Sequence, residues 1–191
     1  MRLFFLALLS YFIGSIPFAF LFIRYKLKKD IRTLGTGNVG AMNSFDVTGS
    51  KMIGISVAVL DAMKGILSVL IAKYVFGDEE RHLMIASFFA VLGHNYPIWL
   101  KLKGGRGLST AAGSTLIFAP AIPILWSAFW MLLKFVSRNV HFQNIFATLA
   151  LFFTIPFFAT IQVFYFALFI GGLILLRHVD VMQEVFRNYR S

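Results

Sequence analysis

Residues 101–110 combine three cations, three glycines and two hydroxyls within ten positions. Glycines let backbone N–H groups approach a ligand closely, and consecutive N–H groups in a turn form a concavity that binds anions. Lysine and arginine add positive charge, and arginine can hold a phosphate through two hydrogen bonds. The hydroxyls fall where the next helix should begin, and its free N–H groups also favour an anion. The stretch therefore predicts a phosphate-binding loop at the membrane surface, formed by Lys103, Gly104, Gly105, Arg106, Gly107, Ser109 and Thr110.

The cations of this loop have a second interpretation. Lys101, Lys103 and Arg106 also fit the ordinary positive charge of cytoplasmic loops in membrane proteins. That interpretation does not account for the glycines and the hydroxyls. The stretch is not a Walker loop, because the spacing of its glycines, lysines and hydroxyls differs from that motif.

A second glycine-rich stretch covers residues 30–43, where glycines alternate with threonine and asparagine. Its pattern is similar to a dinucleotide fingerprint, but no buried strand precedes it and no βαβ unit can follow. A flexible linker is the alternative, although linkers favour serine and repeated glycine and this stretch carries several apolar residues. We interpret it as a loop that packs against the membrane face and holds a polar ligand through Arg32, Thr36, Gly37, Asn38 and Asn43.

Ionisable residues inside apolar runs form a third group of candidates. Asp61 and Lys64 are three residues apart, so they share a helix face and can form an ion pair. We favour a structural role for this pair over direct chemistry. His94 is either a general base, a hydrogen-bond donor to substrate or a structural histidine. His178 follows Arg177 on the same predicted face and joins the binding candidates.

Composition places the chain among integral membrane proteins. Of its 191 residues 59% are hydrophobic, and 23 are phenylalanine, which is more apolar surface than a soluble domain of this size can bury. The absence of cysteine excludes disulfides and thiolate chemistry. Cytoplasmic loops and acidic lipids explain the net charge of +10 better than nucleic acid does. We expect no metal, no cofactor, no nucleic acid and no obligate protein partner.

Apolar runs of about 20 residues can cross a bilayer as helices. The chain is expected to be an all-α, single transmembrane domain over residues 1–191, with spans at 3–23, 52–76, 83–100, 108–119, 123–134, 142–156 and 161–176. Several of these seven helices are short. Reading 120–123 as a turn places the basic segments on one side of the membrane, which gives an N-terminus outside, a C-terminus in the cytoplasm and cytoplasmic motif loops at 24–51 and 101–107.

Five sequence blocks occur in a fixed order along the chain. They are Ser15-Ile16-Pro17, Asp30-Ile31-Arg32 with Gly35-Thr36-Gly37-Asn38-Val39-Gly40-Ala41-Met42-Asn43, Asp61-Ala62-Met63-Lys64-Gly65, Gly93-His94-Asn95-Tyr96-Pro97, and Lys103-Gly104-Gly105-Arg106-Gly107. With these blocks the chain resembles the bacterial membrane glycerol-3-phosphate acyltransferases that use acyl phosphate as donor, the PlsY-type family. That family is similar in having seven helices, with its motifs on the cytoplasmic face. The chain departs from the family pattern at Arg106, where lysine is usual, and at Val181, where asparagine is expected.

The resemblance implies transfer of a fatty acyl group from acyl phosphate to the 1-hydroxyl of glycerol 3-phosphate, without a covalent acyl-enzyme. It further implies a bacterial inner-membrane protein with its active site on the cytoplasmic face, and membrane lipid as its surroundings. We take His94, Asn38 and Lys103 as the catalytic candidates. The donor's own phosphate is the alternative proton acceptor to His94. A transporter or channel for a phosphorylated solute is the competing class, although the polar residues gather at one face and not at the midplane.

Overall fold

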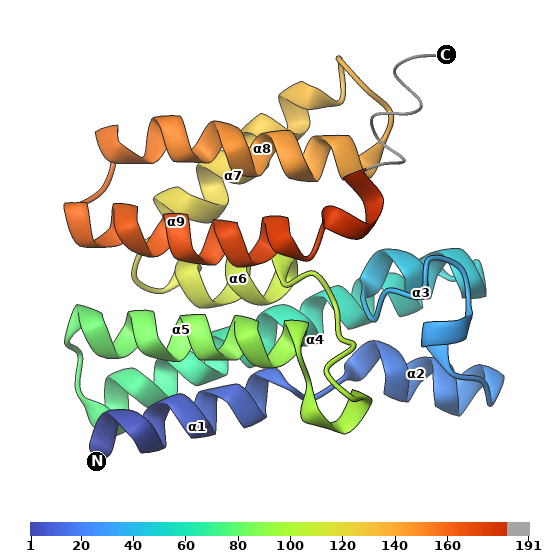
Figure 1. The fold of residues 1–191 in the computed structure, drawn as a ribbon, viewed down its shortest axis with the longest axis horizontal. Coiled ribbons are helices and arrows are strands. Elements are labelled where there is room, and N and C mark those ends of the chain that lie inside the picture. The colour runs from blue at the N-terminus through green and yellow to red at the C-terminus, as the bar shows by residue number, and fades with distance from the viewer. Residues whose placement is uncertain (183–191) are drawn as a thin grey trace. The chain divides into compact units, whose positions relative to one another are not determined.

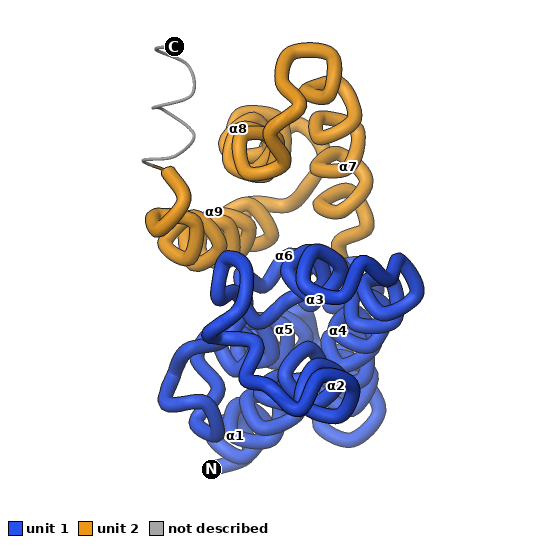
Figure 2. Tube along the Cα trace, turned by 90° about the vertical axis from the view of Figure 1, so that its right-hand side faces the viewer, with its two compact units in different colours: residues 1–118 blue, residues 119–191 orange. Residues whose placement is uncertain are grey.

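The structure is a computed structural model that describes residues 1–182. Within these residues all regular secondary structure is helical, which confirms the expected all-α class. The chain divides into two compact units, residues 1–118 and residues 119–191 (Figure 2).

Unit 1 contains both glycine-rich loops and the α-helices α1 to α6 (Figure 1). Its elements are α1 (Arg2–Gly14), α2 (Phe18–Leu27), η1 (Ile31–Thr33), α3 (Ala41–Thr48), α4 (Lys51–Ile71), the π-helix η2 (Ala72–Phe76), α5 (Glu80–Asn95), η3 (Ile98–Leu100) and α6 (Leu108–Leu116). The start of α1 and the connection between η2 and α5 lie at one end of the unit, and the glycine-rich loops lie toward the other (Figure 1).

Local sequence explains where the helices of unit 1 break. Pro17 lacks an N–H and disfavours a helical conformation in the residue before it, so α1 ends at Gly14 and α2 begins at Phe18. Helix α2 ends at Leu27. The next residue, Lys28, adopts a left-handed conformation at φ 56°, and Arg24 donates to its carbonyl. The segment 24–51, expected to be a loop, also contains the short helix α3, which is followed by the left-handed Gly49.

Small residues let the helices of unit 1 approach closely. A Cβ added to Gly65 would overlap the backbone of Thr110, and one added to Gly113 would overlap the backbone of Ala62. These contacts hold α4 against α6. Gly14 of α1 lies in the same way against the backbone of α5. This kind of packing is typical of membrane helices, where close backbone contact takes the place of a hydrophobic driving force between helices.

Unit 2 contains α7 (Ala121–Leu133), α8 (Val140–Thr154), η4 (Ile155–Phe157) and α9 (Ile161–Leu176). Two tryptophans of α7 donate hydrogen bonds to α8, from Trp126 to Thr148 and from Trp130 to Asn144, both at 3.0 Å. Pro120 directly precedes α7, and Pro156 lies in η4, shortly before the start of α9. Both prolines lie where the sequence indicates a break between helices.

Four helical stretches are long and apolar enough to cross a membrane: Arg2–Leu27, Lys51–Phe76, Glu80–Leu100 and Val140–Phe157. Two shorter apolar helices, Ala121–Leu133 and Ile161–Leu176, also occur, and α6 has nine residues. Large apolar side chains remain exposed on these helices, for example Phe4 at 66% and Phe169 at 68%. An integral membrane protein accounts for this surface, because lipid covers it. A count of seven crossings, the orientation of the termini and a single domain over 1–191 stay predictions.

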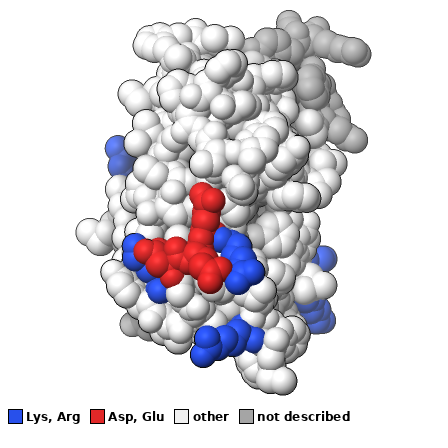
Figure 3. Space-filling model, turned by 90° about the vertical axis from the view of Figure 1, so that its left-hand side faces the viewer, with Lys and Arg blue, Asp and Glu red and all other residues white. Residues whose placement is uncertain are grey.

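The end of unit 1 away from the glycine-rich loops carries a small group of ion pairs. Lys73 pairs with Asp78 at 3.1 Å, and Arg81 pairs with Glu79 at 2.8 Å, all near the connection between η2 and α5. Figure 3 shows acidic side chains gathered between basic ones on this face. The charges therefore neutralise one another, in contrast to the basic segments near the loops.

Candidate functional site

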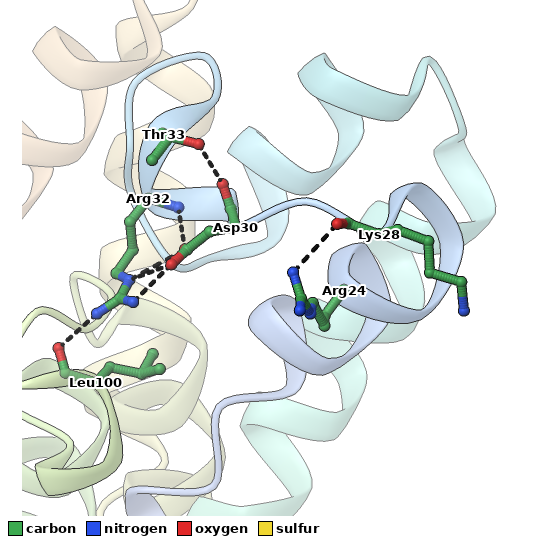
Figure 4. Close-up of polar contacts among 6 residues, drawn as sticks. All are labelled: Arg24, Lys28, Asp30, Arg32, Thr33 and Leu100. Carbon is green, nitrogen blue, oxygen red and sulfur yellow. Dashed lines mark hydrogen bonds and ion pairs between the residues drawn. The ribbon is translucent and has the colours of Figure 1, made fainter.

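The first loop is built around an ion pair between neighbours in the sequence. Asp30 accepts from the Arg32 backbone N–H at 2.9 Å, which caps η1, and its carboxylate pairs with the Arg32 guanidinium at 2.6 Å (Figure 4). These bonds from Arg32 hold the pKa of Asp30 below its ordinary value, against the opposing effect of burial. Arg32 also donates to the Leu100 carbonyl at 3.0 Å. One side chain thus connects the first loop to η3.

Asn43 fixes the shape of the rest of this loop. It is buried, accepts from the Thr36 backbone N–H at 3.0 Å, and donates to the carbonyls of Leu34 and Asn38 at 3.1 and 3.0 Å. Gly37 has a φ of 71°, which glycine adopts without strain. The side-chain amide of Asn43 is therefore used inside the loop, while Thr36 is exposed and Asn38 is half-buried.

The second loop folds back onto the end of α5. The Gly104 N–H donates to the Asn95 carbonyl and the Gly105 N–H donates to the His94 carbonyl, both at 3.1 Å. A side chain on Gly104 would overlap the His94 carbonyl, so glycine is required for this close return. Sequence reasoning assigned these amides to a ligand, whereas the structure uses both to attach the loop to α5. The roles of Gly104 and Gly105 in substrate binding stay predictions.

Gly105 of the second loop meets two other segments, the nearby end of α5 and the first loop, which is distant in sequence. A Cβ built on this residue would overlap Nε2 of His94 and would lie 2.7 Å from the Val39 carbonyl oxygen. The first loop, the end of α5 and the second loop therefore converge on one point. The predicted candidates His94, Asn38 and Lys103 come from these three segments, and Asn38 lies far from the other two in the sequence.

Helix α6 begins directly after the second loop. Gly107 has a φ of 86°, and its carbonyl accepts from the Ala111 N–H at 2.8 Å, which starts the helix. The first N–H groups of a helix have no partner within it and attract anions. Around this start Lys103 is exposed, Arg106 and Thr110 are buried, and Ser109 is half-buried. Lys103 and Arg106 precede the start of α6 in the sequence, and an anion site at this helix start stays a prediction.

A buried polar cluster lies next to this site. Lys64 Nζ lies 2.8 Å from Asp61 Oδ1 and 2.9 Å from His94 Nδ1, and it donates to the Ile16 carbonyl at 3.0 Å. The predicted pair of Asp61 and Lys64 is present, and both side chains are almost completely buried. Sequence reasoning did not place His94 or the Ile16 carbonyl in the same cluster.

An apolar groove opens beside Arg32. It has a volume of about 390 Å³ and is lined by Ile16, Pro17, Phe20, Leu21, Arg32, Trp99 and Leu100. Trp99 is fixed there by a hydrogen bond from its indole N–H to the Ser15 hydroxyl at 2.8 Å. The lining of the groove is therefore apolar except for one cationic side chain, Arg32.

His178 belongs to unit 2, where it follows α9. Its ring is fully buried, and Nδ1 lies 2.8 Å from the Ile174 carbonyl. Its predicted role in substrate binding stays a prediction.

Sequence reasoning missed two polar residues of unit 1. Asp30 was quoted with the first loop but not as the partner of Arg32, although an acid two positions before an arginine can pair with it locally. Asn95 is fully buried, and its Oδ1 lies 2.7 Å from the position of a Cβ on Gly107. It stands next to His94 in the sequence, but no spacing rule indicates that its side chain faces the second loop.

Comparison with known proteins identifies the family. The family model described as glycerol-3-phosphate acyltransferase matches residues 4–188. The glycerol-3-phosphate acyltransferase of Pelagibacter ubique is 43% identical over 137 residues, which cover 70% of each chain. That of Myxococcus xanthus is 42% identical over 133 residues, covering 70% of this chain and 69% of the other.

Solved structures give the same result. The crystal structure of PlsY, an integral membrane glycerol 3-phosphate acyltransferase, in its glycerol 3-phosphate form has a TM-score of 0.87 and 32% identity, covering 98% of this chain and 94% of that one. Its lysophosphatidic acid form has a TM-score of 0.84. The family match covers nearly the whole chain, including the motif loops that converge on Gly105. The chain belongs to the PlsY-type family of membrane glycerol-3-phosphate acyltransferases.

Proposed function

We propose that this protein transfers a fatty acyl group from acyl phosphate to the 1-hydroxyl of glycerol 3-phosphate. The C1 oxygen forms the new ester bond, the bond between the acyl carbon and the phosphate oxygen breaks, and the hydroxyl proton leaves with inorganic phosphate. The products are lysophosphatidic acid and phosphate. The observation that carries the proposal is the meeting of both glycine-rich loops with His94 at Gly105.

Both substrates carry a phosphate, so the reaction needs two anion sites close together. The start of α6, with Lys103 and Arg106 beside it, supports one of them. The first loop supports the other through Arg32, which is held in place by Asp30 and is 27% exposed. Thr36 and Asn38 lie in that same loop and complete the set of donors that we propose for binding.

The apolar groove beside Arg32 suits the acyl chain of the donor. Its lining is mainly aliphatic and aromatic, and the guanidinium of Arg32 lies at its wall. An acyl phosphate combines the same two features, an apolar chain and an anionic head. We propose that the chain enters the groove from the membrane while the head group faces the loops.

No covalent acyl-enzyme is required for this reaction. Acyl phosphate is a mixed anhydride and is already activated, so holding the hydroxyl against the carbonyl supplies much of the rate. Backbone N–H groups and cations stabilise the charge that develops on the acyl oxygen and on the departing phosphate. The chain has no cysteine that could carry the acyl group. We place the reaction at the cytoplasmic face of a bacterial inner membrane, where the basic loops are predicted to lie.

The experiment that tests the function uses purified protein in detergent with glycerol 3-phosphate. Palmitoyl phosphate and palmitoyl-CoA are supplied in parallel, and lysophosphatidate and phosphate are both measured. Product from acyl phosphate alone supports the proposal, and product from the thioester alone overturns the choice of donor. Lys103→Ala should abolish most of the activity, whereas Lys51→Ala, an exposed cation at the start of α4, is the matched control.

Failure with both donors would favour the competing transporter class. Uptake of labelled glycerol 3-phosphate into proteoliposomes then provides the deciding measurement, because a transporter moves the solute across the membrane without any acyl donor. Uptake without acyl transfer would overturn the proposed function.

A further inference from the structure

We propose that the basic end of α2 binds the headgroups of anionic phospholipids in the surrounding membrane. This surface is formed by the exposed side chains of Arg24, Lys26, Lys28 and Lys29. It lies within unit 1 and includes none of the residues that we propose for acyl transfer. The inference therefore goes beyond the proposed function and does not depend on it.

The basic end of α2 carries more positive charge than the nearby chain neutralises. Residues 24–45 contain five cations but a single acid, Asp30, which is already paired with Arg32 at 2.6 Å. Among the ion pairs of the described residues, none involves the four cations of this surface. Figure 4 shows the Lys28 side chain extending away from the Asp30–Arg32 pair. The positive charge is therefore available to an anion from outside the protein.

One face of α2 presents an apolar, an aromatic and a cationic side chain in that order along the helix. Leu21, Tyr25 and Lys28 are spaced by four and then three residues, so they share this face. Leu21 is 49% exposed, and Tyr25 is 81% exposed. The Lys28 ammonium lies 5.2 Å from the centroid of the Tyr25 ring, so these two side chains are neighbours. Tyrosine is enriched where hydrocarbon meets headgroups, and the order therefore matches that of a lipid leaflet.

Distances along the helix fit the thickness of one headgroup layer. Helix α2 forms the end of the stretch Arg2–Leu27, which is long and apolar enough to cross a membrane. At about 1.5 Å per residue, Lys28 lies roughly 10 Å beyond Leu21 and roughly 4–5 Å beyond Tyr25. The headgroup region of a bilayer is about 5–8 Å thick on each side. With Leu21 in the hydrocarbon and Tyr25 at its boundary, the cations lie at the level of the lipid phosphates.

An anionic lipid suits this surface better than an acidic protein does. A protein could pair with the cations, but it would leave the exposed Leu21 of the same face to the membrane. A lipid contacts both, with its chains against Leu21 and its phosphate against the lysines. Clusters of four or more cations at the end of a membrane helix attract anionic lipids, and each cation adds to the attraction. Leu21 also borders the apolar groove, so the lipid surface and the groove adjoin along α2.

Spin-labelled lipids test the proposal without any measurement of activity. With the protein in phosphatidylcholine vesicles, electron paramagnetic resonance gives the fraction of labelled phosphatidylglycerol held at the protein, and labelled phosphatidylcholine is measured in parallel. At low salt we expect the parent protein to hold phosphatidylglycerol about threefold more strongly or better. Equal association of the two lipids would overturn the proposal and leave an acidic protein as the occupant to be sought.

Lys28→Gln/Lys29→Gln locates the preference on this surface. The double variant should lose at least about half of the preference for phosphatidylglycerol. Arg24 is kept, because it donates to the Lys28 carbonyl at the end of α2. The matched control is Lys51→Gln/Lys101→Gln, which removes the same charge from two exposed lysines. Lys101 has a φ of 54° and Lys28 a φ of 56°, so each pair contains one left-handed lysine.

The two double variants separate a local site from net charge. An unchanged preference in Lys28→Gln/Lys29→Gln would overturn the proposal. An equal loss in Lys51→Gln/Lys101→Gln would show that only the net charge of the protein matters, which would also overturn a site at α2.

Two measurements on the parent protein keep the test independent of how the variants fold. Raising the salt from about 0.01 M to about 1 M shortens the Debye length from roughly 30 Å to roughly 3 Å, so the preference should largely disappear. A preference that persists in high salt would rule out attraction by these exposed cations. Glycerol 3-phosphate added at constant ionic strength should leave the preference unchanged. Displacement of the lipid by this substrate would assign the cations to a substrate phosphate and overturn the proposal, whereas a lack of acyl transfer would refute only the proposed function.

Discussion

At the scale of single residues, the Asp30–Arg32 pair shows how one local contact prepares a site. Arg32 places its Nε and one terminal nitrogen on Asp30 and the other terminal nitrogen on the Leu100 carbonyl. The guanidinium is planar, so these bonds fix its orientation as well as its position. Arg32 is therefore preorganised before any anion arrives.

Removal of the carboxylate should affect binding more than chemistry. In Asp30→Asn the guanidinium loses its charged partner and its fixed orientation, so we expect the KM for glycerol 3-phosphate or for acyl phosphate to rise severalfold, with a smaller change in kcat. Steady-state kinetics with each substrate varied in turn provide the measurement. Asp46→Asn, an exposed acid on α3, is the control. An equal rise in KM in Asp46→Asn would show that Asp30 has no special role in orienting Arg32.

The same pair predicts a pH dependence of stability. Because hydrogen bonds from Arg32 lower the pKa of Asp30, the pair contributes in full above the ordinary carboxylate pKa of about 3.9 and is lost as the pH falls through the lowered value. The difference in thermal unfolding midpoint between the parent and Asp30→Asn should stay constant from pH 8 to pH 5 and shrink only near pH 4 and below. A difference that changes between pH 8 and pH 5 would contradict this assignment.

At the scale of elements, the break between α1 and α2 leaves a backbone carbonyl available to a buried lysine. An uninterrupted helix would engage the Ile16 carbonyl in its own ladder, but at the break this carbonyl accepts from Lys64. Trp99 donates to the Ser15 hydroxyl on the other side of the break. The interruption thus connects α1 to α4 and to η3.

Pro17→Ala should allow α1 and α2 to join and should withdraw the Ile16 carbonyl from Lys64. We expect the buried cluster to rearrange and kcat to fall by about tenfold or more, because small displacements of catalytic groups are costly. Acyl-transfer assays report the change in kcat, and NMR spectra of protein with ¹⁵N-labelled histidine report the surroundings of His94. Pro120→Ala, at the exposed start of α7, should leave both nearly unchanged. Parent-like activity and parent-like His94 signals in Pro17→Ala would show that the break is not needed.

Close contact between α4 and α6 leads to a prediction about packing. An alanine at Gly113 would overlap the backbone of Ala62, so Gly113→Ala should cost about 1–3 kcal/mol and lower the unfolding midpoint in detergent. Gly172→Ala is the matched control, since a Cβ there meets no atom within 4 Å in the described part of the chain. The unfolding midpoints of both variants are compared with that of the parent, with tryptophan fluorescence as the signal. Equal midpoints would show that α4 and α6 can separate without cost.

At the scale of the whole molecule, sequence predicts what depends on neighbours along the chain. Proline marked the break at Pro17, and the spacing of three residues predicted the pair of Asp61 and Lys64. Contacts between distant segments were not accessible in this way. His94 lies thirty residues beyond Lys64 on another helix, and no pattern shows that it joins the pair. Likewise, nothing local shows that the N–H groups of Gly104 and Gly105 are used by the carbonyls at the end of α5.

The arrangement in the membrane gives the last prediction, and it depends on charge across the whole chain. With the turn at 120–123, the basic segment after α7 lies in the cytoplasm, whereas a single span over 108–133 would place it outside. The chain has no cysteine, so single cysteines can be labelled without background. In intact cells a membrane-impermeant maleimide should label Asp78→Cys, and it should label Lys29→Cys and Val136→Cys only after permeabilisation. Val136 is 66% exposed, so burial does not explain a lack of labelling. Labelling of Val136→Cys from outside would refute seven crossings, and labelling of Lys29→Cys from outside would reverse the orientation of the loops that form the site.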